Sequence, residues 1–217
     1  MHFTNAGRGT PLWRSAMALV RRRFEATFEA VTAAQPDSFL VAYEARTADA
    51  ANHRVLACAG ITVGRDRPFF CERYLPAPAE EVVSAHLGRS CPREEIMEVG
   101  QMASDSPGAA GALLGVLPVF AWECGMRYAV MTVTEQLGQV LARCGYLFEP
   151  IVEARREQLP VEEQEKWGRY YDAGPRTGVI RMENLAPVLA RSAGRYRSTD
   201  LFFALVDDGE EPRLAVA

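Results

Sequence analysis

The chain has 217 residues, of which 48% are apolar and 24% charged, and its formal net charge is −4 at pH 7. This composition excludes a disordered chain, a collagen-like repeat and a small disulfide-stapled domain, because each departs far from the globular average. The acidic balance provides no uniform positive field for nucleic acid or an anionic membrane. The five Cys residues lack the spacing of zinc or redox motifs, so we expect buried free thiols.

The sequence predicts no membrane segment. Residues 1–11 contain no apolar core of the kind that signal peptides carry. The longest uncharged run, 106–122, is too short for a membrane span and contains Gly and Pro. We therefore expect a cytoplasmic protein without a transmembrane segment, while peripheral membrane contact stays open.

The first periodic segment predicts an amphipathic helix. Apolar residues recur at steps of four and three from Trp13 to Val31, which places them on one helical face. Three consecutive arginines, Arg21–Arg23, interrupt this stripe at its sides. They fit a solvated face, and the alternative is a docking patch for phosphates or an acidic carrier.

Strand-like runs follow this helix. Residues 38–45 and 55–63 predict an antiparallel hairpin with a turn around 49–52. The apolar run 69–75 predicts a third strand, and Pro78 then begins a short helix that ends before Gly88.

Strands and helices alternate from Glu95 onward. They are, in order, a strand over 95–103, a helix over 104–124, a strand over 128–134, a helix over 135–144 and a strand over 146–150. Helices between strands indicate an α/β domain whose neighbouring strands are partly parallel. A polar helix around 162–171 and a short strand at 179–182 follow. We expect a single domain over residues 1–190 and a C-terminal tail over 191–217.

Four sequence blocks resemble the thermostable hemolysin family, in the order in which that family has them. They are FFCERYL (69–75), IMEVGQMAS (96–104), MTVTEQLGQVLARCGY (131–146) and KWGRYYDAGP (166–175). The resemblance covers residues 17–182. The order of elements is also similar to the GNAT (Gcn5-related N-acetyltransferase) fold, to which acyl-homoserine-lactone synthases are related. It implies a mixed β-sheet flanked by helices, with a splayed central strand pair that carries Glu98 and Thr132 and admits a thioester donor.

The resemblance implies an N-acyltransferase. Such an enzyme would move a medium- or long-chain acyl group from acyl-CoA or acyl carrier protein to a small amine acceptor, such as an amino acid or amino alcohol. The thioester would be a co-substrate, with no permanently bound cofactor. We expect no metal, because the three His residues show no ligand spacing. A membrane-active haemolysin and a non-catalytic acyl-CoA or acyl-carrier binding module are the alternatives. Homodimerisation stays open.

Glu98 is the most informative single residue. Strand alternation puts it on one face with Ile96, Gly100 and Met102, so we expect apolar surroundings that raise its pKa. A carboxylate with a raised pKa is a credible base for a protonated amine. The resemblance to lactone synthases, which carry a functionally important Glu on the corresponding strand, supports the same role. The alternative is an ion pair with an arginine.

The start of the helix expected after residue 104 offers a surface for the donor's phosphates, because unpaired N–H groups and the positive dipole end converge there. The residues predicted to bind the donor are Met102, Ala103, Ser104, Gly108, Ala109 and Gly111. The usual acetyltransferase signature is not matched, which favours a longer acyl group or a carrier protein over acetyl-CoA. Alternatively, the small residues only allow close helix packing.

Glu72, Arg73 and Tyr74 form a polar block in the strand expected at 69–75. Period two places Glu72 and Tyr74 on one face and Arg73 on the other. We predict that Glu72 assists catalysis by binding the acceptor's ammonium group, and that Arg73 and Tyr74 line the acceptor or acyl pocket. The alternative is an edge strand with its polar side in solvent.

Three further residues complete the predicted pocket. The hydroxyls of Thr132 and Thr134 are candidates for bonds to pantetheine or the acceptor, although Thr134 also fits a helix N-cap. Trp167, Tyr170 and Tyr171 share one face of the helix expected there. They favour core packing, with an aromatic wall of an acyl tunnel as the alternative.

Overall fold

The computed structural model describes residues 1–32, 35–45, 53–64 and 67–192. The turn expected around 49–52 and the tail from residue 193 onward lie outside the described residues. None of the described helices combines the length and the hydrophobicity that crossing a bilayer requires.

The described strands form one seven-stranded mixed sheet in the order β1-β2-β3-β4-β5-β7-β6. They are β1 (His2–Gly7), β2 (Ser38–Glu44), β3 (Arg54–Val63), β4 (Ile96–Ser104), β5 (Tyr128–Val133), β6 (Phe148–Glu153) and β7 (Arg176–Arg181). Neighbouring strands are antiparallel except β4 and β5, which pair in parallel. The expected α/β fold class is confirmed. The parallel pair is the one that the helix α3 connects, as a crossover requires.

The described α-helices are α1 (Pro11–Phe28), α2 (Ala79–Leu87), α3 (Pro107–Glu123), α4 (Glu135–Cys144), α5 (Val161–Gln164) and α6 (Ala186–Ser192). Short 3₁₀ helices are η2 (Phe70–Tyr74), η3 (Arg93–Glu95), η4 (Arg156–Gln158), η5 (Glu165–Trp167), η6 (Tyr170–Ala173) and η7 (Met182–Leu185). The helices expected at 78–87 and 135–144 are confirmed. Each ends at a glycine, Gly88 or Gly145, in a left-handed conformation.

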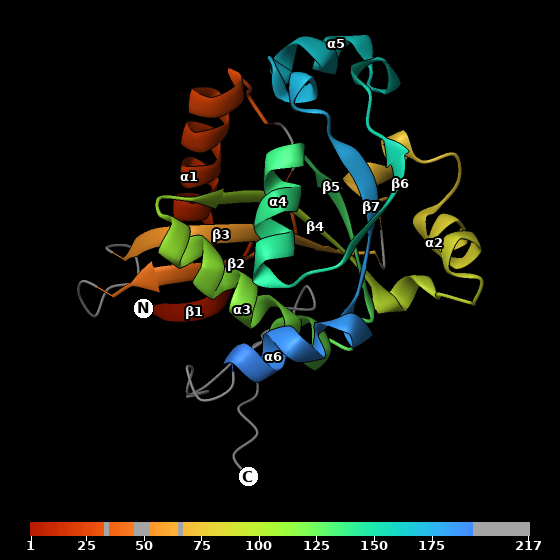
Figure 1. The fold of residues 1–217 in the computed structure, drawn as a ribbon. Helices are drawn as coiled ribbons and strands as arrows, with labels where there is room; N and C mark the ends of the chain where they lie inside the picture. The colour runs from red at the N-terminus through yellow and green to blue at the C-terminus, as the bar shows by residue number, and fades with distance from the viewer. Residues whose placement is uncertain (33–34, 46–52, 65–66, 193–217) are drawn as a thin grey trace.

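Helices cover both faces of the sheet (Figure 1). Leu113, Leu117 and Leu141, from α3 and α4, pack with Met97 and Val99 on one face. The opposite face has two clusters. One joins α1 to β2 and β3, and the other joins η2, α2 and the aromatic residues near Trp167 to β4, β5 and β7. Alternate residues of the central strands thus pack to opposite sides, as strand periodicity requires.

Strand β1 was not predicted. Its sequence HFTNAG is polar and only Ala6 is buried, so the segment lacks the apolar alternation that marks a strand. It nevertheless pairs along its whole length with β2 as the edge of the sheet. An edge strand needs only one partner and little burial, which explains the weak sequence signal.

The prediction of a strand at 69–75 is wrong. Residues Phe70–Tyr74 form η2, in which Cys71 and Tyr74 are buried at a spacing of three. The carboxylate of Glu72 accepts a hydrogen bond from the Phe69 N–H at 2.7 Å, which closes the turn. Glu72 and Tyr74 therefore share no strand face, and the alternation argument for this block fails.

The helix expected around 162–171 is not continuous, since this region consists of α5 and the 3₁₀ turns η5 and η6. Gly168 interrupts it with φ +47°. Hydrogen bonds from the Val31 N–H to the Lys166 carbonyl and from the Arg169 N–H to the Phe28 carbonyl tie it to the end of α1. Tertiary contacts thus replace the regular helix. Val31 itself lies beyond α1 and is exposed, so the apolar stripe ends earlier than expected.

Candidate active site

The two central parallel strands separate partway along their length. β4 and β5 pair at only three positions, Ile96 with Tyr128, Met97 with Ala129 and Glu98 with Val130. β4 continues to Ser104 and β5 to Val133, but the two strands do not pair with each other beyond this point. Beyond Glu98, the edge of β4 that faced β5 is therefore open. This is the splay that the resemblance implied.

An irregularity in β4 lies at this opening. The pairing of β4 with β3 shifts register between the Cys58–Ala103 and Gly60–Gly100 pairs. Gln101, within the shift, has φ +47°, a backbone conformation that a residue with a side chain rarely adopts. Such strained positions persist where the surrounding structure fixes them, and they cluster at functional sites. Here the bulge redirects the main chain of β4 where β5 leaves it.

A cavity of about 350 Å³, which we call the α3 cavity, lies in the gap between the strands. Its walls include Met102, Ala103 and Ser104 of β4, Thr132 of β5 and Leu114 of α3. Arg23, from the arginine run on α1, also lines it. The neighbouring Arg22 forms an ion pair at 2.9 Å with Asp105, just before α3. The arginine run therefore lies beside the start of α3.

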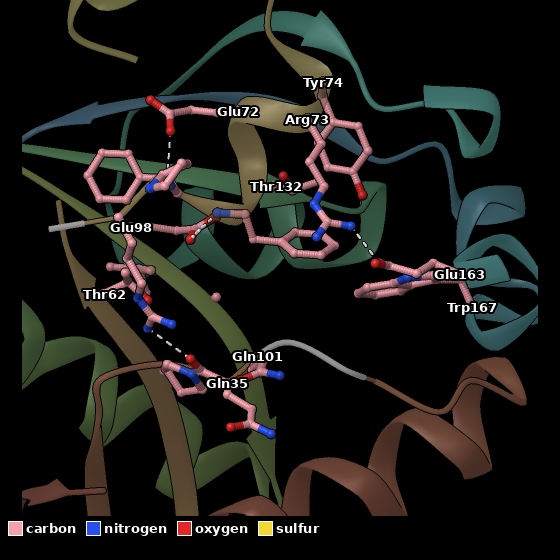
Figure 2. Close-up of a pocket in the computed structure, with 18 of the residues that line it drawn as sticks. Gln35, Thr62, Glu72, Arg73, Tyr74, Glu98, Gln101, Thr132, Glu163 and Trp167 are labelled. Atoms are coloured by element: carbon pink, nitrogen blue, oxygen red, sulfur yellow. Dashed lines mark hydrogen bonds and ion pairs between the residues drawn. The ribbon is translucent and has the colours of Figure 1, made fainter. Parts of the chain in front are cut away.

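A second cavity of about 740 Å³, which we call the η2 cavity, is lined by Glu98 and the turn η2 (Figure 2). The two cavities share one wall. Its residues are Phe24, Val99, Gly100, Gln101, Thr132 and Tyr170. Two chambers therefore meet where β4 and β5 separate, with the carboxylate of Glu98 on the η2 side.

Glu98 projects from β4 toward the first residues of η2. Its carboxylate accepts hydrogen bonds from the Phe70 N–H at 2.8 Å and the Cys71 N–H at 2.7 Å. Burial raises the pKa of Glu98 above its ordinary value, and the two N–H donors only partly oppose this effect. No ion pair of Glu98 is found among the described residues. A carboxylate has more lone pairs than these two bonds use, so it can still accept a proton.

Glu72 lines the η2 cavity but is occupied by structural partners. The Arg93 guanidinium donates to it at 2.6 Å, and the Phe69 and Ala79 N–H groups bond to the same carboxylate. Burial tends to raise the pKa of Glu72, but these donors outweigh burial and lower it. The contacts give Glu72 the role of holding η2 in place, and its catalytic role stays a prediction.

Arg73 and Tyr74 both line the η2 cavity, and they extend from a turn and not from a strand. The Arg73 guanidinium bonds to the Glu163 carboxylate at 2.5 Å and lies 4.8 Å from the centre of the Phe70 ring. The Tyr74 hydroxyl bonds to the Tyr171 hydroxyl at 2.7 Å. These contacts attach the 156–173 region to η2.

Thr132 lines both cavities, and its hydroxyl bonds to that of Thr177 at 2.9 Å. Thr134 lines the α3 cavity and caps α4 by accepting from the Leu137 N–H at 3.3 Å. Trp167 is buried in the aromatic cluster and also forms part of the η2 cavity wall. Both interpretations of Trp167, core packing and a pocket wall, thus apply.

Of the six residues predicted to bind the acyl donor, only those before α3 line the α3 cavity. Met102, Ala103 and Ser104 line the α3 cavity, whereas Gly108, Ala109 and Gly111 do not. Gly108 and Gly111 are exposed, and Ala109 is buried in the core under α3. Ala109 therefore contributes packing and not a donor-facing side chain, as helical periodicity requires for a residue on the inner face. Ser106 and Ala110 line the cavity in their place.

Sequence reasoning missed Arg93 and Glu163. Arg93 donates to Glu72, Glu80 and the Gly64 carbonyl, so it joins three separate segments. Glu163 lies ninety positions from its partner Arg73. No local pattern signals a partner so distant, because ion pairs of this kind depend on the tertiary fold.

Two buried thiols are poorly suited to act as nucleophiles. Burial raises the pKa of the Cys58 thiol to about 12 and that of Cys71, beside Glu98, well above its ordinary value. Cys124 and Cys144 are only half-buried, in contrast to the expectation of buried thiols. Within the described ranges, no cluster of His, Cys, Asp or Glu is arranged as metal ligands would be.

A family model described as thermostable hemolysin matches residues 6–185. No curated protein matches the chain at a significant level.

Several solved structures share the fold. FeeM, an N-acyl amino acid synthase from uncultured soil microbes, superposes with a TM-score of 0.57 at 12% identity, over 86% of this chain and 98% of FeeM. TofI in an apo form gives a TM-score of 0.55 at 14% identity, over 87% and 96%. The CoA-dependent acyl-homoserine lactone synthase BjaI, with SAM and isopentyl-CoA, gives 0.55 at 13% identity, over 88% of each chain. At these identities the likeness establishes the shared fold, so the GNAT-like architecture expected from the sequence is confirmed.

Proposed function

Since the chain belongs to the thermostable hemolysin family, we propose that it is an N-acyltransferase that moves an acyl group from an acyl-CoA or acyl-carrier thioester to a small amine. The observation that carries the proposal is the junction of two cavities at the β4–β5 opening, with the Glu98 carboxylate beside it. Direct transfer between two substrates requires that both be held with their reacting atoms together, and two chambers that meet at one opening allow this.

The α3 cavity suits the donor. It follows the open edge of β4, where main-chain groups have lost β5 as a partner. It also reaches the start of α3, where helix N–H groups and the dipole favour phosphate, beside Arg23. Its inner wall of Met131, Leu113 and Leu114 is apolar, which fits a medium- or long-chain acyl group. BjaI, which shares the fold, was solved with isopentyl-CoA.

The η2 cavity suits the acceptor, because Glu98 faces it. In the proposed reaction Glu98 accepts a proton from the amine, directly or through water, and the nitrogen lone pair attacks the thioester carbonyl carbon. N–H groups on the open edge of β4 polarise that carbonyl. A C–N bond forms and the C–S bond breaks. The leaving thiolate takes up the proton that the amide nitrogen gives up, directly or through water, and Glu98 returns its own proton to solvent. The raised pKa of Glu98 brings its proton affinity nearer to that of the amine.

The direct test is turnover by the purified protein. Octanoyl-CoA and octanoyl acyl carrier protein are offered with a panel of amines, and thiol release and amide formation are followed by absorbance and mass spectrometry. Glu98→Gln keeps the shape of the side chain but removes the base, so we expect kcat to fall roughly 10² to 10⁴-fold with the Kd for octanoyl-CoA unchanged.

Glu153→Gln is the matched control, because Glu153 is an exposed carboxylate whose ion-pair partner is Arg155. It should leave kcat unchanged. Absence of amide with both donors and every amine would contradict the proposal, and undiminished turnover by Glu98→Gln would remove Glu98 from the mechanism.

The family description favours a second candidate, a protein that lyses cells itself. An acyltransferase can account for the same activity, since lipid-tailed amides disrupt membranes. Erythrocytes exposed to the purified protein alone, and to the protein with octanoyl-CoA and an amine, separate the two. Lysis by the protein alone supports the cytolysin, and lysis only with both substrates supports the enzyme.

A further inference from the structure

The turn η2 positions two of the charged side chains that line the η2 cavity, Glu98 and Arg73. The first N–H groups of η2 bond to Glu98, and Arg73 extends from the same turn three residues later. The 3₁₀ rise of about 2 Å per residue places their anchoring points roughly 6 Å apart. In the view of Figure 2, the Arg73 guanidinium lies between Glu98 and the side of the cavity formed by Glu163 and Trp167.

Arg73 retains donors for a ligand. Its described hydrogen bond uses one N–H of a guanidinium that carries five, and goes to Glu163. Packing against the Phe70 ring holds the flat group in a fixed orientation. A planar fork with unused N–H groups suits a carboxylate, which it can bind in bidentate fashion.

The second guanidinium of this cavity, Arg67, is engaged differently. Its Nη2 donates to the Gln35 carbonyl at 2.9 Å and to Asp37 at 2.5 Å. The Arg67 side chain thereby holds the 35–37 segment at the rim of the cavity. Arg73 is the better placed of the two to bind a substrate, because its turn also holds Glu98.

Part of the cavity wall beside Arg73 is aromatic. Trp167 lies 5.5 Å from Phe70 and 5.1 Å from Tyr170, measured between ring centres, and Phe24 stacks on Tyr170 at 6.2 Å. These four rings line the cavity. A surface of this kind favours an apolar or aromatic substituent.

We propose that the amine acceptor is an α-amino acid with a large apolar side chain, whose carboxylate binds Arg73 while its amino group faces Glu98 and its side chain packs on the rings around Trp167. This inference rests on the proposed function and specifies its acceptor. Glu163 balances the charge of Arg73 when the cavity is empty, and the Arg73 fork contacts both carboxylates when it is filled.

The test compares acceptors that differ only in the carboxylate. With octanoyl-CoA or octanoyl acyl carrier protein as donor, kcat/KM is measured for L-phenylalanine, L-phenylalaninamide and 2-phenylethylamine. We expect the wild-type protein to prefer L-phenylalanine at least tenfold. Arg73→Gln should abolish that preference by raising KM for L-phenylalanine, and the readout is the ratio of kcat/KM for L-phenylalanine to kcat/KM for 2-phenylethylamine within the same variant. Arg155→Gln, at an exposed ion pair elsewhere, should behave as wild type.

A binding measurement keeps the inference testable apart from turnover. Calorimetry with N-octanoyl-L-phenylalanine and N-octanoyl-2-phenylethylamine should show tighter binding of the first, lost in Arg73→Gln. Equal use or equal binding of the carboxylate and neutral compounds by the wild-type protein would overturn the inference while leaving acyl transfer intact. A carboxylate preference that survives Arg73→Gln would also overturn it. Failure to acylate any amine would instead count against the proposed function.

Discussion

Glu98 and Glu72 are both held by the turn η2, yet their surroundings move their pKa values in opposite directions. Burial dominates at Glu98 and raises its pKa, because the Phe70 and Cys71 N–H groups and the Cys71 thiol oppose burial only in part. At Glu72 the Arg93 guanidinium and two N–H groups outweigh burial and lower the pKa. Two carboxylates whose pKa values differ in this way suit different tasks. Glu98 is fit to exchange a proton and Glu72 to anchor the turn.

The raised pKa of Glu98 predicts that the pH profile of kcat/KM has an acid limb, in which the rate falls at low pH. The base must be ionised to accept a proton, so kcat/KM should fall as the pH drops through the pKa of Glu98, which lies above the ordinary 4.5. The measurement is kcat/KM against pH for acyl transfer to an aromatic amine of low pKa, which stays neutral across this range. Glu98→Gln should lose the limb along with most of the activity. A limb of unchanged position in this variant would assign the titration to another group.

Among the elements around the site, the 156–173 region supplies Glu163, Trp167 and Tyr170 to the η2 cavity. It has little regular structure of its own and depends on contacts with its neighbours. Gly168 approaches the carbonyls of Phe28 and Glu29 at the end of α1 so closely that a Cβ would overlap them. The cavity wall is thus positioned by the contact between this region and α1.

Gly168→Ala should therefore damage both stability and the acceptor side of the site. Gly168 combines φ +47° with ψ −120°, outside the left-handed helical region, so a side chain there costs roughly 1 to 3 kcal/mol in backbone strain. The overlap with two carbonyls adds roughly 1 to 3 kcal/mol. Gly174→Ala is the control, because Gly174 has φ +59° with no atom within 4 Å of the added Cβ. It should show only the conformational cost.

Urea unfolding of the two variants measures this difference, and KM for the amine should rise in Gly168→Ala more than the Kd for octanoyl-CoA. Equal destabilisation of both variants would show that the contact with α1 does not contribute to the free energy of unfolding.

At the scale of the whole molecule, the sheet brings two chambers together at one opening. α3, α4 and the open edge of β4 surround one, and η2 with the aromatic region surrounds the other. Burial raises the pKa values of Cys58, Cys71 and Cys124, which makes these three thiols poor nucleophiles for an acyl-enzyme.

This arrangement predicts a ternary complex. Initial rates with varied donor and amine should give intersecting double-reciprocal plots, since both substrates must be bound before the acyl group moves. Mass spectrometry of the intact protein after incubation with octanoyl-CoA alone should show no added acyl mass. Parallel plots together with an octanoylated protein would indicate a covalent intermediate instead.

The sequence by itself determined the features that depend on local pattern. The strand over Ile96–Ser104, the helix over 135–144 with its Thr134 cap and the partly parallel sheet follow from periodicity and capping, which act within a few residues. Glu98 stood out because strand alternation places its carboxylate on one face with Ile96, Gly100 and Met102. The family resemblance supplied the splay, which no local rule contains.

Only the tertiary structure decided how the site is assembled. The block 69–75 has the composition of a strand but forms η2, because Glu72 and Arg93 bind it from within and from a distant segment. The edge strand β1 and the irregular 156–173 region owe their form to partners on β2 and at the end of α1. Such contacts join residues far apart in the chain, and their free energy exists only once the sheet has brought those residues together.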